Sequence, residues 1–309
     1  MNHAIVAGGN GLLGRALVLE LSKYGLPVLV LGTSKEIHTN LKHLFQNKVK
    51  YIQTKINADW IINLRKEIKR EKLDGSVFFN LAWRGSEKLN DGGISDQLKN
   101  ISMSCEFVKL AGEVGVDKLI ATGSMEEVIF HRQLSKYSLH ARHVTNHWYG
   151  LAKTSAYMQS AFQAYLSRVD FCYTRVSTVI DKQLRTNKFV ETSIRKILDS
   201  SEMPIPNNFE LCNISSAEEI ARQLVAVAQH GVNKKIYNLG TEYSDSLYGH
   251  FLNLAKIVAS DNEKTTWDRS ALPGLLRPDD FSLARLKEDT GYIPTESTLS
   301  LFSELAGKS

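Results

Sequence analysis

Tyr149 and Lys153 are the residues of this sequence whose types and spacing most directly suggest acid–base chemistry. They stand four positions apart, separated by Gly150, Leu151 and Ala152. Residues four apart lie on one face of a helix, so the lysine ammonium would lie beside the phenol. A nearby positive charge favours the tyrosinate and lowers the pKa of a phenol, which is about 10 in water. The pair predicts a tyrosine that exchanges a proton with a substrate. The alternative is an ordinary solvated helical pair.

Three glycines near the N-terminus suggest a second kind of chemistry. Gly8, Gly11 and Gly14 follow the apolar run at residues 4–7 and are spaced three apart. Glycines here permit a tight turn and a close approach of the main chain to a pyrophosphate. The free N–H groups at the start of the next helix, near Leu12 and Leu13, would bind the phosphates. This pattern predicts a dinucleotide-binding loop, and a plain strand-turn-helix is the alternative.

The end of the second apolar run bears on which dinucleotide is bound. An NAD-binding protein usually carries a carboxylate there, to hold the ribose hydroxyls. This chain has Thr33, Ser34 and Lys35 instead, and these groups suit a 2′-phosphate. We therefore expect NADP(H) to be preferred, with NAD(H) possible. The alternative is that Ser34 only caps a following helix.

Ser124 is expected to share a crevice with the glycine loop. It follows the apolar run at residues 118–121. Ligands of open parallel sheets bind beyond the carboxyl ends of the strands, which is where both Ser124 and the glycines fall. This gives the serine and the Tyr149–Lys153 pair a common location.

The elements that must position these groups alternate along the chain, as in a parallel sheet wrapped by helices. Strands are predicted at residues 3–7, 27–31, 49–53, 76–80, 118–121 and 170–175, and helices at residues 12–24, 34–45, 58–71, 94–114 and 145–166. After residue 175 strands and helices alternate less regularly, with a helix predicted at 216–230 and a strand at 235–239. We predict an α/β fold, a Rossmann-like doubly wound parallel sheet with a smaller C-terminal α/β substrate lobe. The NAD(P)-binding domain would span residues 1–175, and residues 176–309 would form mainly the lobe, interleaved with late elements of the first domain.

Composition excludes several function classes. The 309 residues are 43% hydrophobic and 23% charged, as in ordinary globular proteins, and no apolar run approaches the roughly 20 residues of a membrane helix. The net charge of +5 is scattered, which argues against nucleic-acid binding. Three separated cysteines and the lack of a signal-peptide pattern predict a cytoplasmic protein. His140, His143 and His147 have helical spacing, but no carboxylate motif accompanies them, and we expect no metal.

Taken in order, these features resemble the extended short-chain dehydrogenase/reductases, and among them the enzymes acting on nucleotide-activated sugars. The further marks that carry this resemblance are Asn80-Leu81-Ala82, Asn100, Arg175, Asn213-Ile214, Glu219-Ile220-Ala221, Tyr237-Asn238-Leu239-Gly240, Asp280-Phe281-Ser282 and Thr290-Gly291-Tyr292-Ile293-Pro294. The resemblance covers nearly the full length of the chain. It implies cofactor contacts from Leu81, Ala82 and Asn100, besides the residues above.

The resemblance also implies a role for each catalytic residue. Tyr149 would exchange a proton with the sugar oxygen, Lys153 would hold the nicotinamide ribose and lower the tyrosine pKa, and Ser124 would hydrogen-bond the same oxygen. The 4,6-dehydratases of this family carry Asp-Glu after the serine or threonine, whereas this chain has Met125-Glu126. Methionine supplies no acid, so dehydration is disfavoured.

Other residues are expected to contact the substrate. Arg277 stands where relatives place an arginine on the pyrophosphate, a role that a planar guanidinium suits. Trp83 and Arg84, with Met125 and Glu126, would line the sugar pocket. The alternatives are an exposed loop arginine and a loop merely anchored by tryptophan. Lys55 stands where relatives often carry an acidic residue near the adenine.

The sequence therefore predicts an NAD(P)-dependent oxidoreductase that reduces the keto group of a nucleotide-activated deoxysugar. One alternative is an NAD-dependent nucleotide-sugar epimerase, which uses the same tyrosine and lysine. Others are a non-catalytic dinucleotide-binding regulator and a reductase of non-sugar ketones. The resemblance implies a homodimer that pairs through a four-helix interface including the helix that bears Tyr149.

Overall fold

A seven-stranded parallel sheet forms the centre of the molecule. The computed structural model describes residues 1–44, 48–54, 60–68, 73, 75–85, 93–136, 147–200, 204, 206, 210–259 and 274–308. The sheet has the order β10-β6-β5-β4-β1-β2-β3. Its strands are β1 (His3–Ala7), β2 (Val28–Gly32), β3 (Val49–Gln53), β4 (Ser76–Asn80), β5 (Lys118–Ser124), β6 (Asp170–Val176) and β10 (Ile236–Leu239). The predicted doubly wound sheet is confirmed, because the chain order reverses at β1 and β4.

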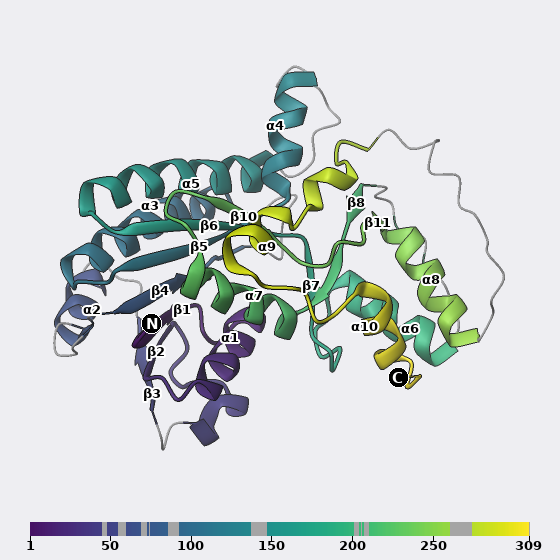
Figure 1. Cartoon of the computed structure of the whole chain (residues 1–309), viewed down its shortest axis with the longest axis horizontal. Helices are drawn as coiled ribbons and strands as arrows, with labels where there is room; N and C mark the ends of the chain where they lie inside the picture. The colour runs from purple at the N-terminus through teal and green to yellow at the C-terminus, as the bar shows by residue number, and fades with distance from the viewer. Residues whose placement is uncertain are drawn as a thin grey trace.

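Helices cover both faces of this sheet (Figure 1). One layer contains α3 (Ile94–Glu113) and α5 (His147–Ser167), which lie side by side, with α2 (Trp60–Ile68) at their flank. The opposite layer contains α1 (Leu12–Lys23) and α7 (Ala217–His230). The late elements α7 and β10 thus complete the main sheet and its cover. The predicted domain boundary after residue 175 stays a prediction.

Alternation along β1 shows why both faces need helices. Ala4 and Val6 belong to the apolar core shared with α1 and α7, whereas Ile5 and Ala7 belong to the core shared with α3 and α5. Successive strand residues point to opposite faces, so an uninterrupted apolar strand has two faces to bury. This is why β1 reads as a continuous apolar run.

The helix predicted at residues 34–45 is wrong. The described part of that stretch contains only the 3-10 helix η1 (Thr39–Leu44). Residues before it are held in a loop by distant groups. The Asn10 side chain accepts a hydrogen bond from the main-chain N–H of His38 (2.9 Å) and donates to the carbonyl of Glu36 (3.0 Å). The Tyr51 hydroxyl donates to the carbonyl of Ser34 (2.7 Å), so Ser34 begins no helix.

Helix α4 (Glu126–Lys136) was not predicted from the sequence, although its first turn carries Glu126 and Glu127. Acidic residues at a helix N-terminus interact favourably with its dipole. The helix starts two residues after Ser124, and its Ile129 packs with Met125 and Phe281 of the C-terminal segment in one apolar cluster. It therefore forms one wall beside the carboxyl end of β5.

The C-terminal lobe has its own small core, made by Ile180, Ile194, Ile214, Phe251 and Phe302. Two short sheets belong to it, one parallel and one antiparallel. Its elements are β7 (Thr178–Ile180), α6 (Phe189–Ser200), β8 (Leu211–Cys212), β9 (Ile214–Ser216), β11 (Asp245–Ser246), α8 (Leu247–Ala259), η3 (Pro278–Phe281), α9 (Ala284–Thr290) and α10 (Thr298–Leu305).

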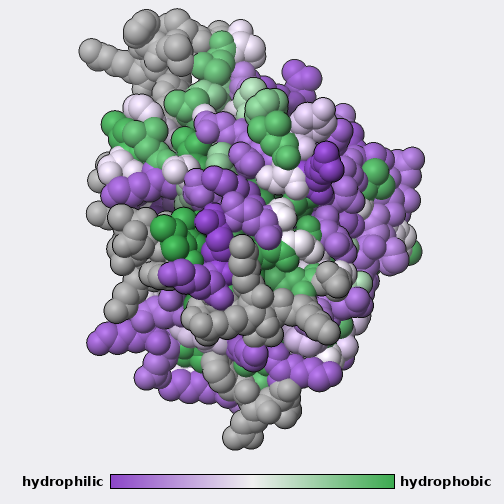
Figure 2. Space-filling view, turned by 90° about the vertical axis from the view of Figure 1, so that its left-hand side faces the viewer, coloured by the Kyte–Doolittle hydropathy of each residue, from purple (hydrophilic) through white to green (hydrophobic). Residues whose placement is uncertain are grey.

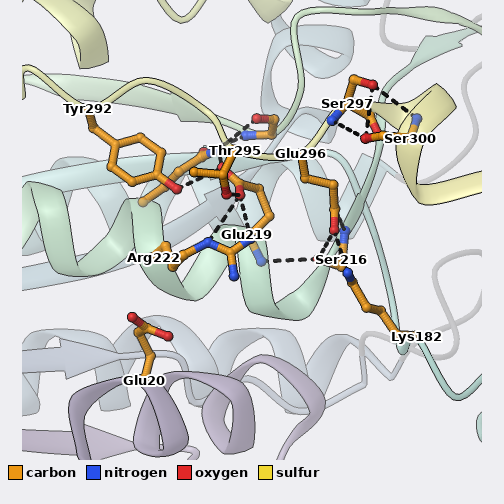
Figure 3. A network of polar contacts seen from close by, with 12 residues as sticks. Glu20, Lys182, Ser216, Glu219, Arg222, Tyr292, Thr295, Glu296, Ser297 and Ser300 are labelled. Atoms are coloured by element: carbon orange, nitrogen blue, oxygen red, sulfur yellow. Dashed lines mark hydrogen bonds and ion pairs between the residues drawn. The ribbon is translucent and has the colours of Figure 1, made fainter. Parts of the chain in front are cut away.

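A buried polar network joins the last segment of the chain to α7 (Figure 3). Glu219 accepts hydrogen bonds from the hydroxyls of Tyr292 (2.9 Å) and Thr295 (2.8 Å). Close by, Glu296 accepts from the main-chain N–H and the hydroxyl of Ser216 (3.0 and 2.9 Å). Polar groups buried in this way are satisfied by one another, so the network fixes the C-terminal segment on the main domain.

The surface viewed from the left-hand side of Figure 1 is mainly hydrophilic, with hydrophobic residues in separate patches (Figure 2). Within the described residues, none of the helices combines the length and the hydropathy needed to cross a membrane.

Candidate active site

The glycine loop is built for close main-chain contacts. Gly8 has a positive φ of +83°, and a Cβ placed on it would lie 2.9 Å from the main-chain nitrogen of Ala82. A Cβ on Gly14 would lie 2.2 Å from the carbonyl oxygen of Gly8. No side chain caps the N-terminus of α1 at Gly11, so its first N–H groups stay available for an anion.

A cavity of about 210 Å³ lies over this loop, beyond the carboxyl ends of β1, β2 and β4. The predicted binding residues among those that line it are Gly8, Gly11, Thr33, Ser34, Leu81, Ala82, Trp83 and Arg84. This loop suits a dinucleotide pyrophosphate for two reasons. Its main chain leaves no room for a Cβ, and the N–H groups at the start of α1 are available. Leu12 and Leu13 instead pack their side chains against the core below, which leaves only their main chain for phosphate.

Replacement of Gly14 by Ala is expected to weaken dinucleotide binding by roughly tenfold to a hundredfold, because overpacking against main chain costs about 1–3 kcal/mol. The added methyl group would meet the main chain of Gly8 and Gly9, which cannot move without opening the loop. Gly93→Ala is the matched control, because a Cβ there meets nothing within 4 Å. Calorimetric titration with NAD⁺ and NADP⁺ measures both variants. Wild-type affinity in Gly14→Ala would contradict the assigned loop.

The end of β2 presents hydroxyls without a carboxylate. Thr33, Ser34 and Lys35 are all exposed there, and Thr33 and Ser34 line the cavity, whereas Lys35 does not. Glu36 is the next acid along the chain, and its carboxylate is paired with Lys42 at 2.8 Å. A Cβ on Gly32 would lie 2.8 Å from the Tyr51 hydroxyl, so Tyr51 packs against the main chain at this point. Lys55 lies outside the described residues.

Ser124, Tyr149 and Lys153 come together where β5 meets α5. Tyr149 is hydrogen-bonded to the Ser124 side chain. The Lys153 ammonium donates to the carbonyl oxygen of Thr122 at 2.9 Å and lies 5.8 Å from the centre of the Tyr149 ring. Lys153 is only 6% exposed. The arrangement that the sequence predicted is therefore present, with a hydroxyl, a phenol and an ammonium at one end of the sheet.

The electrostatics of this group differ from the sequence prediction. Burial raises the pKa of Tyr149, the hydrogen bond with Ser124 opposes this, and the charges of Glu126 and Glu127 add to the rise. Burial lowers the pKa of Lys153 to about 7, while Glu127 acts in the opposite direction. Burial disfavours the charged form of each group. In the chain without ligand the phenol therefore keeps its proton, and the expected lowering of its pKa by the lysine is not found.

Glu127 is a residue of this site that sequence reasoning missed. It is 1% exposed, and one carboxylate oxygen accepts hydrogen bonds from the main-chain N–H of Ser124 (2.8 Å) and the Tyr173 hydroxyl (2.9 Å). The other oxygen lies 3.5 Å from Nε of Arg175. A buried carboxylate behind the serine fixes the main chain that presents Ser124. The sequence did contain a signal for this role, because Glu127 stands three residues after Ser124, close enough for its carboxylate to accept from the serine N–H.

Asn100 supports the cavity wall. Its buried amide accepts from the N–H of Arg84 (3.0 Å) and donates to the carbonyl of Arg84 (2.9 Å). These bonds define the loop after β4, so the structure gives Asn100 a loop-holding role, and the predicted cofactor contact stays a prediction.

The predicted substrate contacts are only partly brought together. Trp83 lies next to Tyr149, but Met125 is buried in the apolar cluster with Ile129, Leu276 and Phe281. Glu126 is half-buried at the start of α4. Arg277 is exposed at the start of η3 and does not line the cavity. The roles of these residues toward a substrate stay predictions.

No cluster suited to a metal ion occurs among the described residues. His140 and His143 lie outside them, as does the side chain of His147.

Comparisons with known proteins identify the family to which the chain belongs. The profile of the family described as NAD dependent epimerase/dehydratase matches residues 4–240. The chain belongs to this family. It is by class an extended short-chain dehydrogenase/reductase, as the sequence predicted. No match was found among curated protein sequences.

Solved structures share the fold over almost the whole chain. The Bordetella bronchiseptica enzyme WbmF, in complex with NAD⁺ and UDP, is 18% identical with a TM-score of 0.71, covering 99% of this chain and 91% of that one. The UDP-glucose 4-epimerase of Thermotoga maritima with UDP-glucose is 16% identical, with a TM-score of 0.71 and coverage of 99% and 98%. The dTDP-glucose 4,6-dehydratase of Bacillus anthracis in complex with NAD is 15% identical, with a TM-score of 0.74 and coverage of 100% and 96%.

Proposed function

We propose that this protein is an NAD(P)-dependent oxidoreductase that reduces a keto group on a nucleotide-activated deoxysugar. The observation that carries the proposal is the meeting of Ser124, Tyr149 and Lys153, with Trp83, which lines the cavity over the glycine loop, in contact with the tyrosine and the lysine. A nicotinamide dinucleotide held by the glycine loop would supply the hydride. The chain itself would supply the proton and stabilise the charge on the substrate oxygen.

Each of the three residues has a distinct task in this reaction. Tyr149 donates its phenolic proton to the ketone oxygen as the carbon is reduced. Ser124 hydrogen-bonds the same oxygen and stabilises the negative charge that develops there. Lys153, when charged, stabilises the tyrosinate that remains. Burial raises the pKa of Tyr149 and makes it a weaker acid, so the charge of Lys153 and the hydrogen bond with Ser124 would have to help it release the proton.

An epimerase is the second candidate function. The family description and the similarity to a UDP-glucose 4-epimerase favour it. Epimerisation begins with oxidation of the sugar, so Tyr149 would first have to accept a proton, and the dinucleotide would remain bound between turnovers. Tight NAD released on denaturing the purified protein would favour the epimerase, whereas consumption of added NADPH or NADH with a keto sugar nucleotide would support the reductase.

The preferred cofactor is either NADP(H) or NAD(H), and one experiment distinguishes the two proposals. The hydroxyls at Thr33 and Ser34 and the lack of a carboxylate at the end of β2 favour NADP(H). Two of the solved structures named above, WbmF and the Bacillus anthracis dehydratase, hold NAD, which favours NAD(H). Titration of the protein with NAD⁺ and NADP⁺, repeated with Lys35→Ala, decides between them. If Lys35 binds a 2′-phosphate, its removal should weaken the binding of NADP⁺ more than that of NAD⁺, because both dinucleotides share the pyrophosphate.

The substrate class rests on the family and on what its relatives bind. WbmF was solved with UDP, and the Thermotoga maritima epimerase with UDP-glucose. Competition by UDP, dTDP, GDP and CDP tests the proposal for this chain. Displacement by none of them would favour the alternative of a non-sugar ketone substrate. Dinucleotide binding without any turnover would favour a non-catalytic regulator. A cytoplasmic location remains a prediction from the sequence.

The homodimer predicted from the sequence is a proposal about the outer face of α3 and α5. Large apolar side chains are exposed there at helical spacing, namely Ile94, Leu98, Met158, Phe162, Tyr165 and Leu166. Exposed apolar patches of this kind mark association sites. We expect a dimer in sedimentation experiments at micromolar concentration and a monomer after Phe162→Glu. A monomeric wild-type protein would contradict this.

A further inference from the structure

Trp83 is held in place by two buried amides of α3. Its indole N–H donates to Oε1 of Gln97 at 3.2 Å, and Gln97 is 2% exposed. Asn100 binds both main-chain groups of the next residue, Arg84. The ring orientation is therefore set by the loop after β4 and by α3, independently of α5 and its catalytic pair.

The fixed ring contacts both members of that pair. The Lys153 ammonium lies 3.7 Å from the centre of the Trp83 ring, over its face. The rings of Trp83 and Tyr149 meet edge to face, with centres 6.0 Å apart and planes at 84°. An indole face carries partial negative charge and attracts a cation, most strongly where water is excluded.

The other partners of the ammonium are few. Within the described part of the chain, its hydrogen bond goes to the carbonyl of Thr122 in β5, although an ammonium has three donors. Glu127 of α4 favours the charged form, and the Tyr149 ring of the lysine's own helix has its centre 5.8 Å from the ammonium. The Tyr173 hydroxyl of β6, which donates to Glu127, lies 3.4 Å from the main-chain carbonyl oxygen of Lys153. The Trp83 face thus supplies an interaction that the hydrogen bonds do not.

We infer that Trp83 is a positioning residue for Lys153: its ring caps the ammonium, holds it beside Tyr149 and favours its charged form. The inference rests on the proposed function, which gives the lysine charge its role in stabilising the tyrosinate. It adds a residue that the glycine-loop and tyrosine–lysine patterns do not include. Because Trp83 also lines the cavity over the glycine loop, the same ring links that cavity to the catalytic lysine.

The test is the titration of Lys153 itself, which requires neither substrate nor cofactor. In protein carrying carbon-13 at Cε of its lysines, the Lys153 signal is assigned by its loss in Lys153→Arg. Its midpoint in the wild type is expected near the value of about 7 that burial imposes on the Lys153 pKa. In Trp83→Leu, which keeps an apolar cover but removes the aromatic face, the midpoint is expected to fall by about one pH unit. Trp83→Phe keeps an aromatic face and should restore most of the difference.

A midpoint that is unchanged or higher in Trp83→Leu would overturn the inference, since the ring would then act only as a cover against water. A second measurement does not depend on that variant folding. In wild-type protein labelled with fluorotryptophan, the Trp83 signal, assigned by its loss in Trp83→Phe, should titrate with the Lys153 midpoint. A Trp83 signal that stays constant through that midpoint would equally overturn the inference.

The proposed function is tested separately by the alkaline side of the pH profile of kcat/KM, which reports groups of the free enzyme. Activity requires the charged form of Lys153, so kcat/KM should decrease as pH rises through the lysine midpoint. In Trp83→Leu this decrease should begin at a lower pH. A shifted lysine titration without any turnover on sugar nucleotides would support the role of Trp83 and count against the reductase.

Discussion

Substitution of Tyr149 by Phe is expected to lower kcat by about 10²–10⁴-fold, the usual contribution of a positioned general acid. The variant keeps the ring and its edge-to-face contact with Trp83, and it loses only the hydroxyl that bonds to Ser124. Affinity for the dinucleotide should therefore stay close to that of the wild type. Steady-state kinetics with keto sugar nucleotides, together with calorimetric titration of the cofactor, separate the two effects.

The matched control is Tyr24→Phe, the same change at an exposed position outside the site and outside the proposed dimer face. Its kcat should equal that of the wild type. Turnover by Tyr149→Phe at the wild-type rate would remove the phenol from the mechanism. A joint loss of turnover and dinucleotide binding would instead show that the hydroxyl supports the fold of the site, which the proposal does not predict.

The parts of this site that follow from local sequence were predictable. The glycine loop and the strand before it depend on residues that are neighbours in the chain, so spacing alone indicates them. The position of Ser124 followed from the general rule that the carboxyl ends of parallel strands share one edge. Tyr149 and Lys153 followed from helical spacing.

The parts that depend on distant contacts were not predictable from spacing. The loop before η1 looked helical, but Asn10 and Tyr51 hold it open from other parts of the chain. The pKa of Tyr149 was expected to fall, because the spacing showed a neighbouring lysine but not the burial of both groups. The contact between Lys153 and Trp83 joins α5 to the loop after β4, which only the folded sheet brings together.

Removal of the Glu219 side chain is expected to cause the largest loss of stability. This carboxylate is fully buried and accepts hydrogen bonds from Arg222 (2.6 Å), Gln223 (2.8 Å), Tyr292 and Thr295 (Figure 3). Breaking such a buried pair from one side costs about 3–5 kcal/mol, because the remaining partners stay buried without an acceptor. Urea unfolding of Glu219→Ala measures the loss.

Glu242→Ala provides the contrast, because it removes a carboxylate paired with Lys287 at 2.7 Å on the surface. Exposed ion pairs contribute about 0–1 kcal/mol, so the free energy of unfolding should hardly change. Equal effects of the two substitutions would contradict the view that burial of the network holds the C-terminal segment on α7.

A double variant separates the loss of the carboxylate from the penalty on its partners. The Arg222 guanidinium is only partly exposed, and its hydrogen bonds with Glu219 raise its pKa against the effect of burial. After Glu219→Ala this cation is left without its counter-ion. Glu219→Ala combined with Arg222→Ala should therefore unfold less easily than the sum of the two single changes implies, because contacting residues are not additive. Additive losses would show that each side chain contributes through packing alone, and that the ion pair itself does not fasten the C-terminal segment to the sheet domain.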